Sequence, residues 1–254
     1  MILQGKSFIS TVSVHKSVEF KNIFEPLGAN VIDFPMSEIL AMEKTPVIQS
    51  VIRQIEKFQW IIFTSANGVV HFHRLLKEIG NESQIPNGIK IASVGIKTAN
   101  AIENNGRKVD FTGSRNTVEN LVDDLMAKES LQNCNILLPL GNLAPDTLEK
   151  RLSKIAKVTR INVYRTVKAG IADSGPVELI KNNHYDLILF TSPSGMDNFV
   201  ETLGPEIVNR EVRVASIGSV TTLAAEHHGF TCVLTAKIST YEGLAHEIIN
   251  YYNT

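Results

Sequence analysis

The chain contains a long internal repeat. Residues 91–125 and 214–248 align without a gap, at a constant offset of 214 − 91 = 123 positions. The identical pairs include Ala92/Ala215, Ser93/Ser216, Gly95/Gly218, Thr98/Thr221, Gly106/Gly229, Thr112/Thr235, Thr117/Thr240, Glu119/Glu242 and Leu121/Leu244. Upstream of each copy lies a second match, FTSANG at 63–68 and FTSPSG at 190–195. Such a chain is built from two versions of one structural unit.

Short apolar runs alternate with amphipathic segments of helical period, such as 118–127 and 244–251. The apolar runs predict strands at 7–11, 31–34, 60–64, 89–94, 109–112, 135–138, 159–164, 186–191, 212–217 and 231–235. Near-continuous apolar strands that alternate with helices are typical of parallel sheets covered on both faces. The predicted fold class is therefore α/β, with two doubly wound parallel-sheet domains.

The two copies differ in their C-terminal neighbours. A strand-helix-strand piece at 135–167 comes after the first copy, whereas no such piece comes after the second copy. The missing piece resembles residues 7–35. We therefore expect residues 1–34 to join 169–254 in one discontinuous domain, with 47–161 as an inserted domain. The chain would cross between the domains through two extended linker segments, 35–46 and 162–168, which predicts a hinge beside an interdomain cleft.

The composition limits the possible partners. The 254 residues include 43% hydrophobic residues and carry a net charge of −1 at pH 7, with a pI of about 6.7. This balance is typical of a globular protein and points to neither nucleic acid nor an anionic membrane as partner. The first residues, MILQGKSFIS, lack a signal-peptide pattern, and no apolar run is long enough to span a membrane. We expect a cytoplasmic monomer, with Cys134 and Cys232 as reduced thiols.

Small hydroxyl residues and glycines follow nearly every predicted strand. The segments concerned are 64–67, 95–98, 112–117, 141–142, 191–194, 218–221 and 235–240. These residues cap helices and leave backbone N–H groups at the helix N-terminus facing outward, where they attract anions. Each loop taken alone is better explained by capping, but both copies place the same groups at corresponding edges. Because ligands bind beyond the carboxyl ends of parallel strands, the set predicts a site for a large polyanionic ligand.

We expect neither a metal nor a cofactor. Residues 95–98, GIKT, resemble the end of a phosphate-binding loop but lack its Gly-Lys pair and its earlier glycine, and no G-x-G-x-x-G is present. His71 and His73 are two residues apart on a predicted helix and should point in different directions, so they are poor joint metal ligands. The sequence contains no C-x-x-C and no H-E-x-x-H.

Four segments, read together, resemble the uroporphyrinogen-III synthase family. They are FTSANGVVHF at 63–72, VGIKTANAIENNG at 94–106, LLPLGNLAPDTLEKRL at 137–152 with INVYRT at 161–166, and FTSPSGMDNF at 190–199 with ASIGSVTTLAAEHHG at 215–229. The resemblance extends from residue 63 to the C-terminus. The N-terminus departs from the family pattern, because Val12 follows Thr11 where members often have arginine.

The resemblance implies two α/β domains joined by a two-stranded linker, with the active site in the cleft. It implies a lyase of porphyrin, tetrapyrrole and heme biosynthesis that needs no cofactor. The implied substrate is hydroxymethylbilane, a linear tetrapyrrole with acetate and propionate arms. The substrate would lose its terminal hydroxyl as water and cyclise to uroporphyrinogen III, with inversion of the last pyrrole ring. A polycarboxylate of this kind agrees with the polyanion site that the strand ends predict.

By resemblance, Tyr164 in INVYRT is the candidate proton donor, and a tyrosine packed in the linker is the alternative interpretation. The candidate substrate-binding residues are Ser65, Asn67, Gly95, Lys97, Thr98, Arg115, Asn142, Ser192, Ser194, Gly218 and Thr221. For Gly95, Asn142 and Gly218 the binding group would be the backbone amide. Lys97, Arg115 and Arg213 are candidates to pair with carboxylates.

A rival hypothesis is a two-domain binding or sensor protein that closes on a small ligand without chemistry. Two α/β lobes with two crossovers fit that function equally well. The FTSPSG and INVYRT segments favour the synthase.

Overall fold

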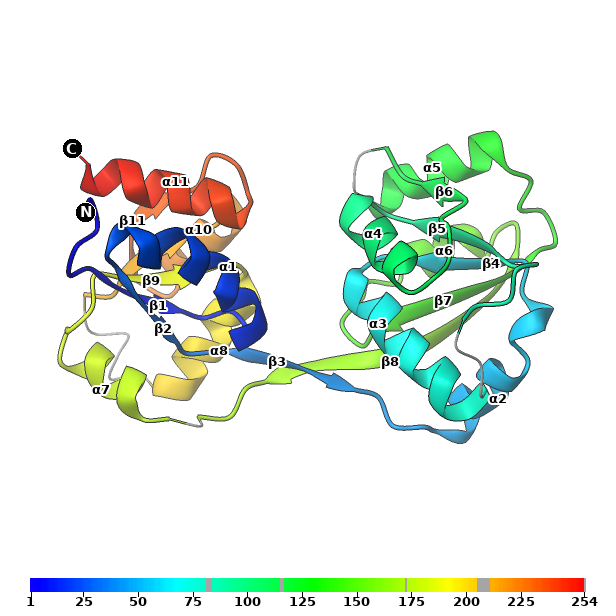
Figure 1. Cartoon of the computed structure of the whole chain (residues 1–254), viewed down its shortest axis with the longest axis horizontal. Helices are drawn as coiled ribbons and strands as arrows, with labels where there is room; N and C mark the ends of the chain where they lie inside the picture. The colour runs from blue at the N-terminus through cyan, green and yellow to red at the C-terminus, as the bar shows by residue number, and fades with distance from the viewer. Residues whose placement is uncertain (81–83, 115–116, 172, 205–210, 254) are drawn as a thin grey trace. The chain divides into compact units, whose positions relative to one another are not determined.

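The computed structural model describes residues 1–80, 84–114, 117–171, 173–204 and 211–253. The chain divides into two compact units (Figure 1). Unit 1 comprises Met1–Glu38 and Val167–Thr254, and unit 2 comprises Ile39–Thr166. Unit 1 is therefore discontinuous and unit 2 is inserted into it. The chain passes between the units inside two strands, β3 (Ser37–Ala41) and β8 (Lys157–Lys168).

Unit 2 contains a six-stranded sheet in the order β3-β8-β7-β4-β5-β6. Its further strands are β4 (Trp60–Phe63), β5 (Lys90–Ser93), β6 (Phe111–Thr112) and β7 (Asn135–Gly141). Its helices are α2 (Pro46–Arg53), α3 (Ala66–Leu75), α4 (Ile96–Asn104), α5 (Val118–Lys128) and α6 (Thr147–Leu152), with a 3-10 turn η2 (Ile55–Lys57) and a π-helical turn η3 (Leu76–Gly80). The strand pairs β4·β5, β4·β7, β5·β6 and β7·β8 are parallel.

Unit 1 contains a five-stranded sheet in the order β11-β10-β9-β1-β2. Its strands are β1 (Ser7–Ser10), β2 (Asn30–Asp33), β9 (Leu187–Phe190), β10 (Arg213–Ser216) and β11 (Thr231–Thr235). Its helices are α1 (Val14–Phe24), α7 (Gly175–Lys181), α8 (Pro193–Leu203), α10 (Ser219–His227) and α11 (Tyr241–Tyr252), with a 3-10 turn η1 (Glu25–Leu27). The β1·β2, β1·β9, β9·β10 and β10·β11 pairs are parallel. The N-terminal strand thus lies inside the sheet of the C-terminal segment.

Alternate side chains of the central strands enter different cores, which explains the continuous apolar runs. In β4, Ile61 and Phe63 pack in one buried cluster, and Trp60 and Ile62 pack in another. The strand β9 repeats this arrangement with its four residues in two further clusters. Helices accordingly cover both faces of each sheet (Figure 1). The expected fold class, α/β with two doubly wound parallel sheets, is confirmed.

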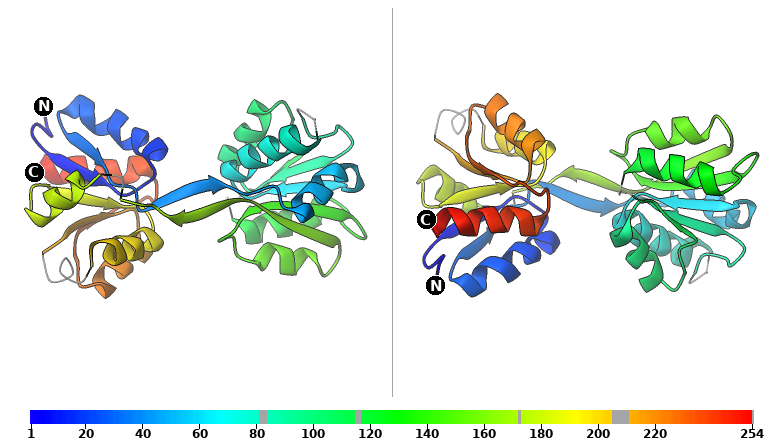
Figure 2. Two further views of the ribbon diagram at one scale, coloured as in Figure 1. Left: turned by 90° about the horizontal axis from the view of Figure 1, so that it is seen from below. Right: turned by 90° about the horizontal axis from the view of Figure 1, so that it is seen from above.

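The two connecting strands form one antiparallel pair at the edge of the unit 2 sheet (Figure 2). The N–H of Met42 donates to the carbonyl of Val163, and the N–H of Ala169 donates to the carbonyl of Met36. The residue numbers of each bonded pair add up to 205. Residue numbers therefore rise along one strand as they fall along the other, as in an antiparallel pair. The strand β3 was not among the predicted strands. Its five residues are too few and too polar to give a strand pattern, and its partner β8 lies over a hundred residues away in the sequence.

The predicted strand at 135–138 is too short, since β7 continues to Gly141. Pro139 disfavours a central strand because it has no N–H to donate. In the structure, the pairing of β7 with β4 reaches Leu137, whereas its pairing with β8 continues through Pro139 to Gly141. The proline therefore lies beyond the part of β7 that pairs with β4. Among the described residues, no helix is long and apolar enough to cross a membrane.

Candidate functional site

Each sheet has a point where the direction of chain progression reverses. In unit 2, β5 and β6 follow β4 on one side, and the chain then returns to place β7 on the other side. In unit 1 the same reversal separates β9 from β1. Ligands of open α/β sheets bind beyond the carboxyl ends of the strands at such points. The residues that follow β4 and β7 in unit 2, and β9 and β1 in unit 1, are therefore the first candidates.

Ser65 and Ser192 occupy equivalent positions in the two units. Ser65 is the N-cap of α3, which follows β4, and Ser192 is the N-cap of α8, which follows β9; each serine has an extended backbone. The Ser65 Oγ accepts from the N–H of Gly68 at 3.1 Å, and the Ser192 Oγ accepts from the N–H of Gly195 at the same distance. The capping interpretation is thus correct for both hydroxyls, which still have a proton to donate.

Tyr164, the expected proton donor, lies on β8 beside the end of β7. Its hydroxyl is 3.3 Å from the Ser65 Oγ. Its ring lies across Gly141, where a Cβ would be 2.5 Å from the ring Cζ. The ring of His71 on α3 lies 5.6 Å from the Tyr164 ring, between centroids, with an interplanar angle of 30°. Tyr164 is half-buried, and its hydroxyl lies within hydrogen-bonding distance of Ser65.

His71 contributes a neutral imidazole to this cluster. Burial, and to a smaller extent the positive charge of Arg74, lowers the pKa of His71 below its usual value of 6.5. The Nδ1 atom is buried and has no hydrogen-bond partner among the described residues. The neutral form dominates at pH 7, so the imidazole packs beside the phenol without adding a charge there. His73, two residues on, is 7% exposed and lies inside the unit.

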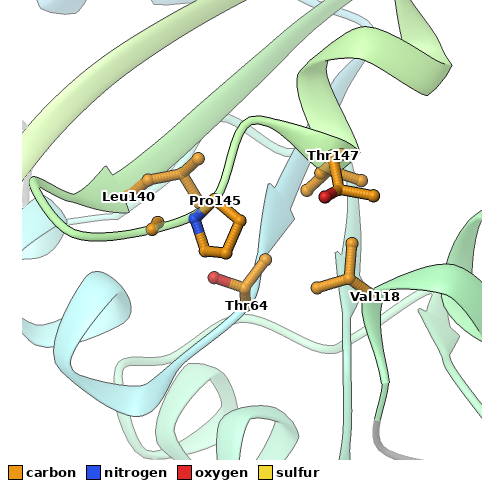
Figure 3. A pocket seen from close by; sticks show the side chains of 7 residues that line it. Thr64, Val118, Leu140, Pro145 and Thr147 are labelled. Carbon is orange, nitrogen blue, oxygen red and sulfur yellow. The ribbon is translucent and has the colours of Figure 1, made fainter.

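A small cavity opens at the same edge of unit 2 (Figure 3). Its volume is about 110 Å³, and its lining residues are Thr64, Val118, Leu140, Ala144, Pro145, Thr147 and Leu148. These residues come from the ends of β4 and β7, the start of α5, the loop before α6, and the first turn of α6. The walls are mostly apolar, with two threonine side chains. The cavity therefore lies at the reversal point of the sheet, where the topology places a ligand.

The loops after β5 and β10 also occupy equivalent positions in the two units, but they place their residues differently from Ser65 and Ser192. Gly95 and Gly218 are the N-caps of α4 and α10. Thr98 and Thr221 are only 6% and 3% exposed, so their side chains lie inside the units. Lys97 is exposed on the first turn of α4.

Asn142 is already engaged within the protein. Its backbone N–H donates to the carbonyl of Tyr164 at 3.2 Å, and its side-chain Oδ1 accepts from the N–H of Thr166 at 2.8 Å. The expectation that this amide faces a ligand does not fit these contacts. The backbone of β8 occupies the N–H and the side-chain oxygen of Asn142, and the loop sequence alone did not reveal this pairing.

The remaining candidates occupy several places. Asn67 is half-buried on the first turn of α3. Ser194 is exposed, with its Oγ 3.3 Å from the Ser192 Oγ. Arg115 lies outside the described residues. Arg213 begins β10 and donates to the carbonyl of Tyr185, so it lies at the amino end of its strand and not at the carboxyl end, where ligands of parallel sheets bind.

Two contributors to the site were missed from the sequence. His71 was considered only as a metal ligand, and Gly141 only as a member of a polar loop. A glycine directly after six strand residues is the signal that could have revealed Gly141, since a strand seldom needs glycine unless another group approaches it closely. Among the described residues, no cluster of three or more His, Cys, Asp or Glu side chains could hold a metal ion.

Known proteins resemble this chain over most of its length. The family model described as "Uroporphyrinogen-III synthase HemD" matches residues 18–246. A uroporphyrinogen-III synthase of Chlorobaculum parvum is 26% identical over 227 residues, covering 88% of this chain and 90% of the relative. A uroporphyrinogen-III synthase of Synechococcus elongatus is 27% identical over 252 residues, covering 95% and 94%.

Solved structures show the same fold. A mutant uroporphyrinogen III synthase from Thermus thermophilus superposes with a TM-score of 0.63 at 18% identity, over 98% of each chain. A uroporphyrinogen-III synthetase from Helicobacter pylori gives a TM-score of 0.61 at 16% identity, over 97% of this chain and 99% of the other. The family model covers most of the chain, and the relatives cover it nearly end to end. The chain belongs to the uroporphyrinogen-III synthase family, whose members are enzymes of the lyase class.

Proposed function

We propose that this protein closes the linear tetrapyrrole hydroxymethylbilane into uroporphyrinogen III, with loss of water and inversion of the last pyrrole ring. The observation that carries the proposal is the cluster of Tyr164, Ser65 and Gly141 at the reversal point of the unit 2 sheet. It brings a phenol, a hydroxyl donor and a helix N-terminus together without any permanently charged side chain among the three.

The hydrogen bonds suit Tyr164 to the role of proton donor. Ser65 accepts from the N–H of Gly68, so its own proton is available for the Tyr164 oxygen at 3.3 Å. The Tyr164 proton is then free to move to the terminal hydroxyl of the substrate. The C–O bond breaks, water leaves, and an azafulvenium cation remains. The Ser65 hydroxyl would stabilise the phenolate that forms, since hydrogen bonds to the charged form favour it.

Ring closure requires positioning more than further acid–base chemistry. The substituted carbon of the last pyrrole ring attacks the cationic carbon and forms a spiro intermediate. After rearrangement, the closing ring carbon loses a proton, which restores the phenol. Holding the chain in the folded geometry required for attack at that carbon is an orientation effect, and shielding the cation from water prevents its hydrolysis.

The acetate and propionate arms require donors at several points. We propose that the first turns of α3, α4, α8 and α10 bind them through backbone N–H groups, as helix N-termini bind anions. Ser65, Asn67, Gly95, Lys97 and Thr98 belong to these turns in unit 2. Ser192, Ser194, Gly218 and Thr221 belong to them in unit 1. The small cavity beside Thr64 and Leu140 would accommodate an apolar part of the substrate.

We further propose that the protein acts as a cytoplasmic monomer, without nucleic acid as a partner. The balanced charge of 25 basic and 26 acidic residues supports the absence of a nucleic-acid partner, since nothing in the net charge would draw the protein to a polyanion.

The direct test is to incubate purified protein, without added metal or cofactor, with freshly made hydroxymethylbilane. The uroporphyrin isomers are then separated after oxidation. We expect the type III isomer in excess over an enzyme-free control. Type I isomer alone, which is the spontaneous product, would contradict the proposed function and favour a binding protein without chemistry.

A further inference from the structure

The ladder between β7 and β8 contains an irregularity next to Tyr164. Leu140 pairs with Asn162, but the next residue of β7, Gly141, pairs with Tyr164. Val163 is therefore the additional residue of a β-bulge, and it is fully buried. A bulge changes the direction of a neighbouring side chain. Here it brings Tyr164, rather than Val163, opposite Gly141.

Gly141 provides a surface on which the phenol ring lies. A Cβ at this position would be 2.5 Å from Cζ, 2.6 Å from Cε2 and 2.7 Å from the hydroxyl oxygen of Tyr164. Separations under about 3 Å are far below van der Waals contact. Any residue other than glycine would thus displace the ring from its present place and move the hydroxyl away from Ser65, which lies 3.3 Å from it.

Asn142 fixes the backbone of β8 on the C-terminal side of the bulge. Its Oδ1 accepts from the N–H of Thr166 at 2.8 Å, and its Nδ2 donates to the carbonyl of the same residue at 3.4 Å. Its backbone N–H donates to the carbonyl of Tyr164 at 3.2 Å. Three hydrogen bonds from one residue therefore hold Tyr164 and Thr166 in a single register.

We propose that Gly141 and Asn142 are positioning residues for Tyr164: the glycine leaves room for the ring, and the asparagine holds the bulged strand that carries it. The role of Tyr164 as proton donor rests on the proposed function, but its placement by these two residues does not. Asn142 is thus assigned to the architecture of the site and not to substrate contact.

The first readout is spectroscopic and needs no substrate. The chain has five tyrosines, so protein made with tyrosine isotope-labelled at Cζ gives one signal for each, and Tyr164→Phe identifies the signal of Tyr164. We expect Gly141→Ala and Asn142→Ala to shift this signal and leave the other four in place. Gly88→Ala and Asn104→Ala are the controls, because a Cβ at Gly88 meets nothing within 4 Å and Asn104 is exposed. An unshifted Tyr164 signal in both variants would overturn the proposal.

The second readout is kinetic. We expect Gly141→Ala to lower kcat roughly 10–100-fold with little change in KM, as misplacement of a reacting group does. Adding Gly141→Ala to Tyr164→Phe should cause no further loss, since both act through one group. Asn142→Asp keeps the acceptor for Thr166 but loses the Nδ2 donor, so its kcat should fall between wild type and Asn142→Ala. Additive losses in the double variant would contradict the proposal.

The two failures are distinguishable. If the wild-type protein forms no type III isomer, the proposed function is wrong, while the Tyr164 signal still tests the placement. If Gly141→Ala does not fold, as judged by the fluorescence of Trp60, which is buried in unit 2, the two Asn142 variants test the proposal by the same signal.

Discussion

Tyr164 is held by neighbours of different chemistry: a glycine under its ring, an imidazole beside it and a serine hydroxyl at its oxygen. Gly141 and His71 contact the ring, whereas Ser65 contacts the oxygen alone. Removal of the oxygen should therefore alter the chemistry of the site and leave its packing intact. A substitution that keeps the ring and removes the oxygen therefore tests the oxygen alone.

We expect Tyr164→Phe to reduce the rate of type III formation by at most about 10²-fold, the lower end of the range for a positioned general acid. Water or a substrate carboxyl can protonate the leaving hydroxyl in place of the phenol. The ring of Phe should pack on Gly141 as before, so the thermal melt should not change. The measurement is the initial rate of type III formation, with Tyr251→Phe, an exposed tyrosine, as control. A folded variant without detectable activity would show that the reaction depends on a dedicated proton donor.

His71 should make unit 2 less stable in mild acid. Burial, followed by the charge of Arg74, lowers its pKa in the folded protein below the usual 6.5. The unfolded chain therefore binds a proton more readily, and the free energy of unfolding falls as the pH drops below 6.5 and towards the folded-state pKa.

We expect His71→Asn to remove part of this fall in the free energy of unfolding. Urea titrations followed by Trp60 fluorescence, between about pH 5 and pH 7.5, measure the free energy of unfolding across the range in which unperturbed histidine titrates, at about 6.5. The exposed His15, replaced by Asn, is the control, and an unchanged pH dependence in His71→Asn would refute the assignment.

At the scale of elements, the same turn recurs in both units: a buried strand ends, a serine follows, and the third residue after it donates its N–H to that serine. Capping and anion binding use the same helix terminus but respond differently to charge. A carboxylate at the cap still accepts the N–H bond and is favoured by the helix dipole, yet it repels a carboxylate of the substrate.

We therefore expect Ser192→Ala and Ser192→Asp to have opposite effects on stability and unequal effects on KM. The alanine variant loses the cap and should lose about 1 kcal/mol of stability, with a loss in substrate binding of at most roughly 1.5–3 kcal/mol. The aspartate variant should melt at or above the wild-type temperature but raise KM more strongly. Calorimetry and the KM for hydroxymethylbilane measure the two effects. Equal KM values for the two variants would mean that this helix terminus does not bind a carboxylate.

At the scale of the whole molecule, the strand order decides which pieces can fold. The strand β1 lies between β9 and β2, and its Phe8 packs in the same buried cluster as Leu187 and Leu189. Residues 167–254 without residues 1–38 would expose the edge of β9 and lose that part of the core. Unit 2, in contrast, is one continuous segment from Ile39 to Thr166.

We expect residues 39–166 to fold alone, since the segment holds its whole sheet except the ends of β3 and β8, and residues 167–254 not to fold. Joining residue 254 to residue 1 through a short linker, to give 167–254 followed by 1–38, should restore folding. The two ends of unit 1 lie close, with the rings of Phe8 and Tyr252 6.0 Å apart. Thermal melts by circular dichroism measure the three fragments. Cooperative unfolding of 167–254 by itself would contradict the expectation.

The sequence alone determined the properties that depend on local pattern and on repetition. The apolar runs of β4 and β9 predicted parallel sheets covered on both faces, because a buried strand needs apolar residues on both sides. The offset between the copies predicted two units, and the missing strand-helix-strand piece predicted that the N-terminus completes the second. Ser65 and Ser192 could be found as caps because capping depends on neighbours in the chain.

The tertiary structure decided the features that depend on partners distant in the chain. The pairing of β3 with β8, the bulge at Val163 and the hydrogen bonds of Asn142 to Thr166 are formed between segments that no local pattern connects. For the same reason, the repeat suggested Thr98 and Thr221 as binding residues, although the packing of their helices buries both side chains. Gly141 shows the difference most directly, since only the ring of Tyr164, twenty-three positions further along, requires a residue without a Cβ there.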